Sequence, residues 1–379
     1  MTSTGTVESP QLLVEGEKIV EIASRATSPL PAGVSLLDFG DVMIAPGYVD
    51  LHIHGSDGFD VMDDSTDALP AVERLLARHG VTSYYPTTVT APMDTTLRAL
   101  TRLANAIESP RPLQDSQRRA RPRGIHLEGP FISHQRKGMH PAEHLLPPTM
   151  KTFDRFWQAA RGHIRMMTIA PELDGAVEVI AEANRRGVCV SLGHSDADSD
   201  AARRGIEAGA RHATHTFNAM RPLDHRSPGI LGVALTDSRL SADIIADGVH
   251  LDPAIVKLFA HAKGPEQTVL ITDATAATGM PEGRYHLGST EVQVKDGKVM
   301  AEGRLAGSVL TMDVAVRNLA RFAGWSLAQA TAAASRNPAR VARLANKGAL
   351  VAGADADFVV LNQAGEVLRT FIGGLECSA

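Results

Sequence analysis

The sequence predicts an α/β chain in which a (β/α)8 TIM-like barrel stands beside a small β-sandwich domain formed by both chain termini. Three observations carry this prediction. The 379 residues, 44% of them hydrophobic, suffice for one large α/β domain with a small partner. Eight short apolar runs alternate with helical patterns through the middle of the chain. Further short apolar runs occupy both ends.

The two ends of the chain carry β patterns. Gln11 to Ile22 holds two apolar runs around Gly16, which is typical of a hairpin, and Val34 to Ile44 continues in the same manner. Ala356 to Leu361 has the composition of a buried strand, and Glu366 to Ile372 predicts another. Because the two ends of a domain often lie close together, we expect these pieces to form one small β domain.

The middle of the chain supplies the strands of the expected barrel. We expect the barrel over residues 47–345, and the small β domain over residues 1–46 and 346–379. An open doubly wound sheet is the alternative, but no G-x-G-x-x-G follows the first strand, which weakens it. The eight candidate strands are Val49–Gly55, Thr82–Val89, Gly124–Phe131, Ile164–Ala170, Val188–Ser195, His212–Phe217, Leu240–Asp247 and Val269–Ala274.

Helix signals fall between most of these strands. Asp252 followed by Pro253 is typical of a helix start. Asp296-Gly297 within Val292 to Met300 predicts an inserted β-hairpin. Apolar side chains recur at three- and four-residue steps over residues 68–79, 177–184 and 312–322.

Composition narrows the classes of function. The chain carries 38 Lys and Arg against 43 Asp and Glu, a net charge of −5, and this mild acidity argues against a nucleic-acid binder. No apolar run approaches the roughly 20 residues that span a bilayer, and residues 1–10 have no secretory signal pattern. Two cysteines, Cys189 and Cys377, cannot form a disulfide framework. We therefore expect a cytoplasmic protein with neither a nucleic-acid nor a membrane partner.

Histidines and carboxylates gather where the candidate strands end. In a barrel these ends converge on one face, which carries the chemistry of such folds. His52 and His54 are two residues apart on a strand, so both can face inward. Imidazole and carboxylate ligands suit a borderline divalent ion such as zinc. Six of the eight strand ends carry such residues: His52 and His54; His126 and Glu128; His194; His215; Asp247 and His250; and Asp273.

A metal centre explains this joint pattern better than chance does. Any one histidine at a strand end is more often a hydrogen-bonded structural residue, and Asp273 alone could be a cap or a turn residue. Six such positions at converging strand ends are harder to explain one by one. Glu128 has two carboxylate oxygens and could bridge two ions, with His194 and His215 completing a second site. His126 shares the face of Glu128, where only a supporting role is considered for it.

Several segments of the chain match motifs of a known family. The chain resembles the amidohydrolase superfamily and, within it, the N-acetylglucosamine-6-phosphate deacetylases. The resemblance covers nearly the whole chain, and HLEGPF and T-H-x-x-N-A-M are its specific parts. The matching segments are PGYVDLHIHG (46–55), HLEGPF (126–131), KGMH (137–140), LGHS (192–195), THTFNAM (214–220), ADGVH (246–250), ITDA (271–274), GSVLTMD (307–313) and GADADFVVL (353–361).

The resemblance implies a barrel that binds two divalent ions per chain, with zinc favoured and Fe²⁺ or another divalent ion as the alternative. Many superfamily members bridge their ions with a carboxylated lysine at the end of the fourth strand, but here residues 168–171 hold no lysine. Glu128 takes the bridging place, which favours a deacetylase over dihydroorotase- or hydantoinase-like enzymes. The implied ligands are Glu128, His194 and His215 for one ion, and His52, His54, Asp273 and Glu128 for the other.

The implied reaction is hydrolysis of the acetamide of N-acetylglucosamine 6-phosphate to glucosamine 6-phosphate and acetate, in amino-sugar catabolism and cell-wall sugar recycling. Hydroxide generated at the metal attacks the acetyl carbon, and Asp273 acts as general base and then as general acid. His250 is implied to hydrogen-bond the substrate. The resemblance assigns phosphate binding to His140, Asn218, Ala219 and Arg226, the last supplied by the neighbouring subunit of a homodimer.

Three alternatives stay open. Arg221 lies closer to Asn218 in sequence and competes with Arg226 as a phosphate ligand, because Arg226 by itself would be a solvated loop charge. Another metal-dependent amidohydrolase, acting on N-acyl amino acids or cyclic amides, would show no preference for phosphate. A non-catalytic protein built on the same barrel would be expected to have lost metal ligands, whereas here the full set is present.

Overall fold

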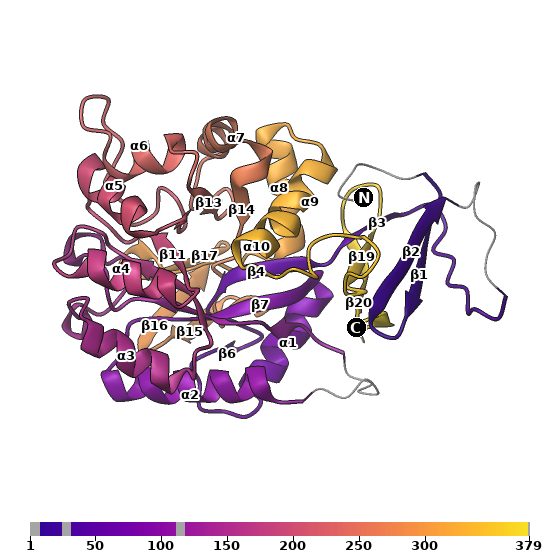
Figure 1. The fold of residues 1–379 in the computed structure, drawn as a ribbon, viewed down its shortest axis with the longest axis horizontal. Coiled ribbons are helices and arrows are strands. Elements are labelled where there is room, and N and C mark those ends of the chain that lie inside the picture. Colours follow the sequence, from indigo (N-terminus) through magenta and orange to yellow (C-terminus); the bar gives the residue numbers. More distant parts are fainter. Residues whose placement is uncertain (1–7, 25–31, 111–117, 378–379) are drawn as a thin grey trace.

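A parallel barrel forms the body of the molecule (Figure 1). The computed structural model describes residues 8–24, 32–110 and 118–377. The barrel strands pair in chain order, so the predicted fold class is confirmed. No strand extends more than one residue outside its predicted range, although several end earlier than predicted. The strands are β4 (Tyr48–Ile53), β7 (Val81–Thr88), β9 (Ile125–Glu128), β10 (Ile164–Ile169), β11 (Cys189–Leu192), β12 (His212–Ala213), β13 (Ser241–Ile244) and β14 (Thr268–Leu270).

The first and last strands meet just beyond their ends. Ile53 and Ala274 form a parallel bridge. Beside it the N–H of Asp273 donates to the carbonyl of His52 at 2.9 Å, and the N–H of His54 donates to the carbonyl of Ala274 at 2.8 Å. The barrel therefore nearly closes at its C-terminal end, which brings the residues after β4 and β14 together.

Helices cover the outside of the barrel (Figure 1). Asp252 caps α7 by accepting from the N–H of Ala254, and Pro253 occupies its first turn, as predicted. No described helix has both the length and the apolar character needed to cross a membrane. The helices are α1 (Ala68–Arg78), α2 (Met93–Glu108), α3 (Met150–Ala159), α4 (Ala176–Arg185), α5 (Ser199–Ala208), α6 (Gly229–Thr236), α7 (Pro253–Gln267), α8 (Met312–Ala323), α9 (Leu327–Ala334) and α10 (Arg336–Val341).

Strands from both ends of the chain build a small β-sandwich beside the barrel. The hairpin of β1 (Pro10–Glu15) and β2 (Lys18–Ser24) packs on a sheet ordered β21–β20–β19–β3. A separate core fills the space between them, with Ile19, Phe358 and Phe371 buried. The sheet consists of β3 (Met43–Pro46), β19 (Phe358–Leu361), β20 (Val367–Ile372) and β21 (Leu375–Glu376).

One predicted β segment is wrong over most of its length. Residues 34–42 form no strand, and only the end of the segment enters β3. Val34, Leu36 and Leu37 are exposed. Their apolar character had suggested β structure, but the strands of the sandwich find their partners elsewhere, so this stretch has no ladder to join.

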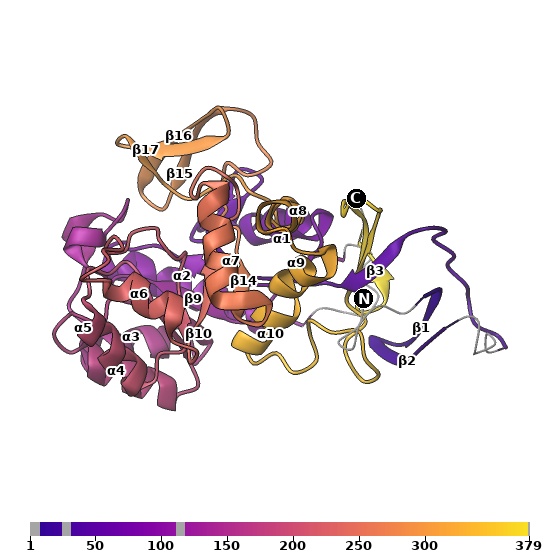
Figure 2. The same cartoon turned by 90° about the horizontal axis from the view of Figure 1, so that it is seen from above.

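A four-stranded sheet is inserted between β14 and α8 (Figure 2). It contains the predicted hairpin at Asp296-Gly297 and extends it by one strand on each side. The N–H of Gly288 donates to Asp60 at 2.8 Å, which ties the sheet to β6 (Phe59–Asp60), a short strand that follows β4. Its strands are β15 (Gly283–Leu287), β16 (Thr290–Lys295), β17 (Lys298–Ala301) and β18 (Arg304–Leu305).

Candidate metal centre

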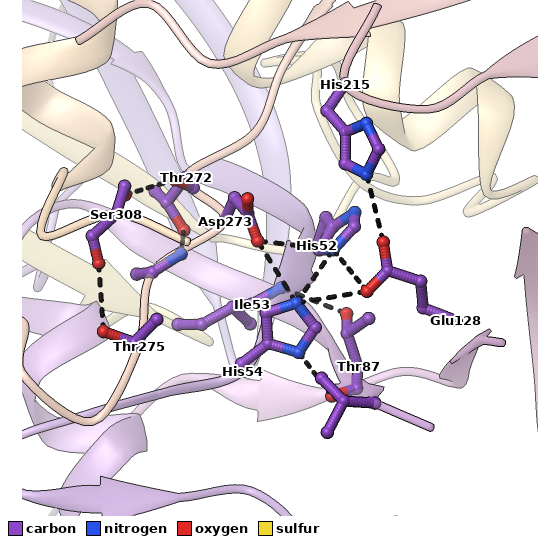
Figure 3. A network of polar contacts seen from close by, with 12 residues as sticks. His52, Ile53, His54, Thr87, Glu128, His215, Thr272, Asp273, Thr275 and Ser308 are labelled. Carbon is purple, nitrogen blue, oxygen red and sulfur yellow. Dashed lines mark hydrogen bonds and ion pairs between the residues drawn. The ribbon is translucent and has the colours of Figure 1, made fainter. Parts of the chain in front are cut away.

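Two groups of His and Glu side chains that could hold a metal ion share the carboxylate of Glu128 at the C-terminal end of the barrel. Figure 3 shows His52, His54 and His215 around this carboxylate. In the first group, Oε1 of Glu128 lies 3.2 Å from Nε2 of His194 and 3.1 Å from Nε2 of His215. In the second group, Oε2 lies 3.5 Å from Nε2 of His52 and 3.4 Å from Nε2 of His54. The two oxygens therefore face different pairs of histidines.

Asp273 completes the second group. Its Oδ1 lies 3.1 Å from Nε2 of His54 and 3.5 Å from Nε2 of His52. Asp273 follows β14, and the near-closure of the barrel places it against the two histidines of β4. Both groups are buried.

The backbone is left-handed at three of these positions. His194 has φ 46°, His215 has φ 28° and Asp273 has φ 50°. Non-glycine residues avoid this region, and it costs on the order of 1–3 kcal/mol where it occurs. Each lies just past the end of its strand, where the turn directs the side chain back over the mouth of the barrel.

Carbonyl partners fix the proton positions on two of the histidines. The Nδ1–H of His54 donates to the carbonyl of Thr87 at 3.0 Å, and the Nδ1–H of His194 donates to the carbonyl of Arg136 at 2.9 Å. A carbonyl only accepts, so each Nδ1 carries a proton and each Nε2 faces the site, where it could coordinate an ion. Metal-bound histidines use this arrangement.

The carboxylates of the site are ionised at neutral pH. Burial would raise the pKa of Glu128, but the charge on His52 and hydrogen bonds from other histidines hold it well below its usual range. Burial also opposes ionisation of Asp273, yet the hydrogen bond from His54 helps to lower its pKa to about 2. Burial lowers the pKa of His194 to about 4, which keeps its lone pair free. Burial opposes protonation of His54 and His215, yet hydrogen bonds to the carboxylates raise the pKa of His54 well above its usual range and help to raise that of His215 to about 9. A divalent ion binding to these nitrogens would displace their protons.

The spacing of the donor atoms fits a divalent ion. The Nε2 atoms of His52 and His54 lie 3.1 Å apart, as do those of His194 and His215. Ligands about 2.0–2.2 Å from one tetrahedral ion would lie roughly 3.3–3.6 Å apart. The contacts of 3.1–3.5 Å within each group are therefore close to those of a coordination shell.

Two buried aspartates support the site and were missed from the sequence. Asp50 accepts from the N–H of His52 at 3.2 Å and from the hydroxyl of Thr272 at 2.6 Å, so it joins β4 to the segment before Asp273. Asp243 accepts from the N–H of His215. The sequence feature that could have revealed both residues is a carboxylate inside an otherwise apolar strand run.

His126 packs against the ring of His52, with the ring centroids 4.7 Å apart, but both of its nitrogens have partners outside the two donor groups. Its Nδ1 contacts the carbonyl of Leu51 at 3.0 Å, and its Nε2 contacts the hydroxyl of Thr168 at 2.8 Å. Burial lowers its pKa well below the usual range. His126 therefore packs beneath the site as a neutral residue.

A cavity of about 170 Å³ opens beside Glu128. Leu287 and Leu305 of the inserted sheet form part of its wall. Arg226 is exposed and is not among the described residues that line it. Arg221 is held by Asp196 at 2.9 Å. Four predicted substrate-binding residues do line the cavity: His140, Asn218, Ala219 and His250.

The profile of the amidohydrolase family matches residues 43–376, which is most of the chain. The chain belongs to the amidohydrolase family. This family is metal-dependent, and the two groups around Glu128 supply the donors that such an amidohydrolase needs.

Curated relatives of this amidohydrolase, and solved structures of similar proteins, match it over nearly the whole chain. An N-acetylglucosamine-6-phosphate deacetylase of Lysinibacillus sphaericus is 36% identical, with 96% of this chain and 92% of the relative covered. An N-acetylgalactosamine-6-phosphate deacetylase of Escherichia coli O157:H7 is 38% identical, with 99% and 96% covered. A Mycobacterium smegmatis N-acetyl-D-glucosamine-6-phosphate deacetylase, solved as an aspartate-to-alanine mutant with N-acetyl-D-glucosamine-6-phosphate, superposes with a TM-score of 0.89 at 35% identity, covering 97% and 94%.

Asp196 helps to position His194 through its contacts with two arginines. It accepts from Arg136 at 2.7 Å and from Arg221 at 2.9 Å, and Arg136 supplies the carbonyl that orients His194. We expect Asp196→Ala to weaken metal binding about 10-fold or more, because such supporting contacts typically contribute that much. Competition with a chromogenic chelator measures this affinity, with the exposed Asp200→Ala as control. Unchanged metal affinity in Asp196→Ala would show that Asp196 does not position His194 for metal binding.

Proposed function

We propose that this amidohydrolase removes the acetyl group of N-acetylglucosamine 6-phosphate, giving glucosamine 6-phosphate and acetate. The observation that carries the proposal is the pair of donor groups sharing Glu128 in a barrel that matches the deacetylases end to end. The chain is then a cytoplasmic hydrolase of amino-sugar metabolism. One ion is held by Glu128, His194 and His215, and the other by His52, His54, Asp273 and Glu128, with zinc as the favoured metal.

Asp273 is the proposed acid and base. Divalent ions in such a site lower the pKa of water towards about 7 and polarise a carbonyl. The low pKa of Asp273 leaves its carboxylate free to accept the proton of the attacking water. The protonated carboxyl then gives this proton to the amine nitrogen as the C–N bond breaks. One side chain serves both steps because it borders the ion-binding group and the cavity.

Two histidines of the cavity take complementary substrate roles. Nδ1 of His140 accepts from the N–H of Thr90 at 3.2 Å, so its proton sits on Nε2 and can be donated to the acetyl oxygen. That Nε2 lies 3.6 Å from Glu128, close to the reacting centre. His250 carries its proton on the other ring nitrogen. Its Nδ1–H donates to Asp247 at 2.7 Å, which leaves Nε2 to accept from a sugar hydroxyl. We therefore place His140 nearer the acetyl group than the phosphate.

The phosphate site is proposed to span two subunits. Asn218 and Ala219 border the cavity, while Arg226 projects from an exposed loop of the same chain. Leu223, three positions before Arg226 in the sequence, is 47% exposed, which fits a surface that another copy of the chain covers. In the resulting homodimer, Arg226 of one copy reaches the cavity of the other.

Arg226→Ala is expected to weaken binding of the phosphorylated substrate by about 2–4 kcal/mol, as for loss of one partner of a buried charge pair. Steady-state kinetics measure this as a loss in kcat/KM, with His225→Ala of the same exposed loop as control. An equal loss on unphosphorylated N-acetylglucosamine would contradict phosphate binding. Mixing Arg226→Ala with Asp273→Asn chains tests the shared site, because only a shared site yields hybrid dimers with one intact centre.

His52→Asn is expected to lower the metal content by about one ion per chain. The substitution removes a ligand of only one donor group, so the group of Glu128, His194 and His215 keeps its ion. Elemental analysis of the purified variant measures the ratio of metal to protein. A metal content equal to that of the unsubstituted chain would favour a single-ion site.

A substrate panel tests the proposal. The relatives include deacetylases named for both the gluco and the galacto phosphosugar. We expect the highest kcat/KM with N-acetylglucosamine 6-phosphate, a lower value with N-acetylgalactosamine 6-phosphate, and the lowest with unphosphorylated N-acetylglucosamine. Equal rates with and without phosphate would favour another amidohydrolase activity.

A further inference from the structure

A second cavity lies at the opposite end of the barrel from the metal centre. Its volume is about 330 Å³, larger than the cavity beside Glu128 and within the range of small-ligand sites. Cys189 and Ser241, the first residues of β11 and β13, form part of its wall, as do Arg211 and Gln267, which directly precede β12 and β14. It is thus built from the N-terminal strand ends, whereas the site around Glu128 uses the C-terminal ends.

Positive charge dominates the lining of this second cavity. Four arginines border it, Arg211, Arg239, Arg340 and Arg343, against one carboxylate, Glu266. Such a concentration is unexpected in a chain of net charge −5. Burial raises the pKa of Cys189 to about 12, although the charge of Arg343 opposes this shift. The thiol therefore stays neutral and offsets none of the positive charge of the arginines.

Two of these arginines keep their charge uncompensated. Arg239 pairs with Asp237 and Glu207 at 2.7 Å, and Glu266 is shared between Arg336 and Arg340. Within the described parts of the chain, by contrast, Arg211 and Arg343 have no carboxylate partner.

The contacts of Arg211 leave it able to bind a ligand. Its Nη1 donates to the carbonyls of Ile206 and Ala210, which hold the side chain in place without neutralising it. Arg343 follows α10 in a left-handed conformation, with φ 55°. Both side chains border the cavity from its exposed rim. A guanidinium group matches the oxygens of phosphate through paired N–H donors.

We propose that this cavity is a binding site for a small phosphate-bearing metabolite, separate from the substrate site. Arg211 and Arg343 bind the phosphate oxygens, and Ser238 and Gln267 add polar groups at the wall. The site belongs to a single chain and lies at the end of the barrel away from the acetyl chemistry. Arg211 and Arg343 therefore take no part in the reaction.

Calorimetric titration of the metal-loaded protein with inorganic phosphate tests this site. We expect two binding events, one at each end of the barrel. The double variant Arg211→Gln/Arg343→Gln should weaken one of them at least tenfold and leave kcat/KM for the acetyl substrate unchanged. Ser238→Glu should weaken the same event, because it places a carboxylate in the cavity without removing a described side-chain contact. Arg98→Gln, an exposed arginine on α2, is the matched control.

Thermal unfolding of each variant without phosphate confirms that the fold is kept. A single event in the unsubstituted protein, or two events that survive both the double variant and Ser238→Glu unchanged, would overturn the proposal. Binding that is lost equally in Arg98→Gln would show a diffuse charge effect and would also overturn it. A parallel titration with succinate separates phosphate recognition from attraction of any dianion, and equal affinity for succinate would contradict the phosphate assignment.

Discussion

Asp273→Asn is expected to lower kcat by about 10²–10⁴-fold, the usual contribution of a positioned acid–base group. Asparagine keeps the size of the side chain but cannot take a proton from water and pass it to the leaving amine. The group of Glu128, His194 and His215 does not use Asp273, so it should retain its ion. Single-turnover acetate release, measured beside metal content, separates the two effects.

Two controls sharpen the Asp273 result. Added metal should leave the rate low if the loss is in proton transfer, and should restore it if the loss is only in metal binding. The KM for the phosphosugar should change little, because the phosphate contacts proposed for Asn218, Ala219 and Arg226 do not involve Asp273. Unchanged turnover in the variant would exclude Asp273 as the acid–base group.

Glu128→Ala is expected to have the largest effect in the molecule. Both donor groups depend on this carboxylate, so its removal should deplete both ions and lower activity by at least about 10³-fold, since no activated water remains. Elemental analysis and acetate release measure the two consequences. Glu143→Ala removes an exposed carboxylate of the nearby loop and serves as the matched control.

Glu128→Gln distinguishes charge from shape at the same position. The amide keeps the volume of the side chain, so a loss of metal in this variant reflects the missing charge. Full metal content in both Glu128 variants would show that the ions, if bound, are held by other residues. That outcome would contradict the bridged site.

The barrel and the composition of the site were predictable because each depends on a local sequence pattern. Apolar runs separated by helical stripes specify a parallel barrel, and polar residues at the strand ends must then converge. His52, His54, Glu128 and Asp273 were found in this way. The geometry of their approach was not, since it depends on left-handed turns and on the closing contact between Ile53 and Ala274.

Long-range contacts explain what the sequence could not predict. Asp50 and Asp243 support the histidines through hydrogen bonds to other strands, and a lone carboxylate in a strand run does not reveal its partner. The orientation of His140 follows from Thr90, 50 residues away. Residues 34–42 had the apolar character of a strand but no neighbouring strand to pair with.

Acetate release from N-acetylglucosamine 6-phosphate, with and without chelator, tests the central claim most directly. We predict rapid release by the metal-loaded protein, loss of release after chelation, and recovery when a divalent ion is added back. Unphosphorylated N-acetylglucosamine should react far more slowly under the same conditions. Release that is indifferent to the chelator, or no release by fully metal-loaded protein, would contradict a metal-dependent phosphosugar deacetylase.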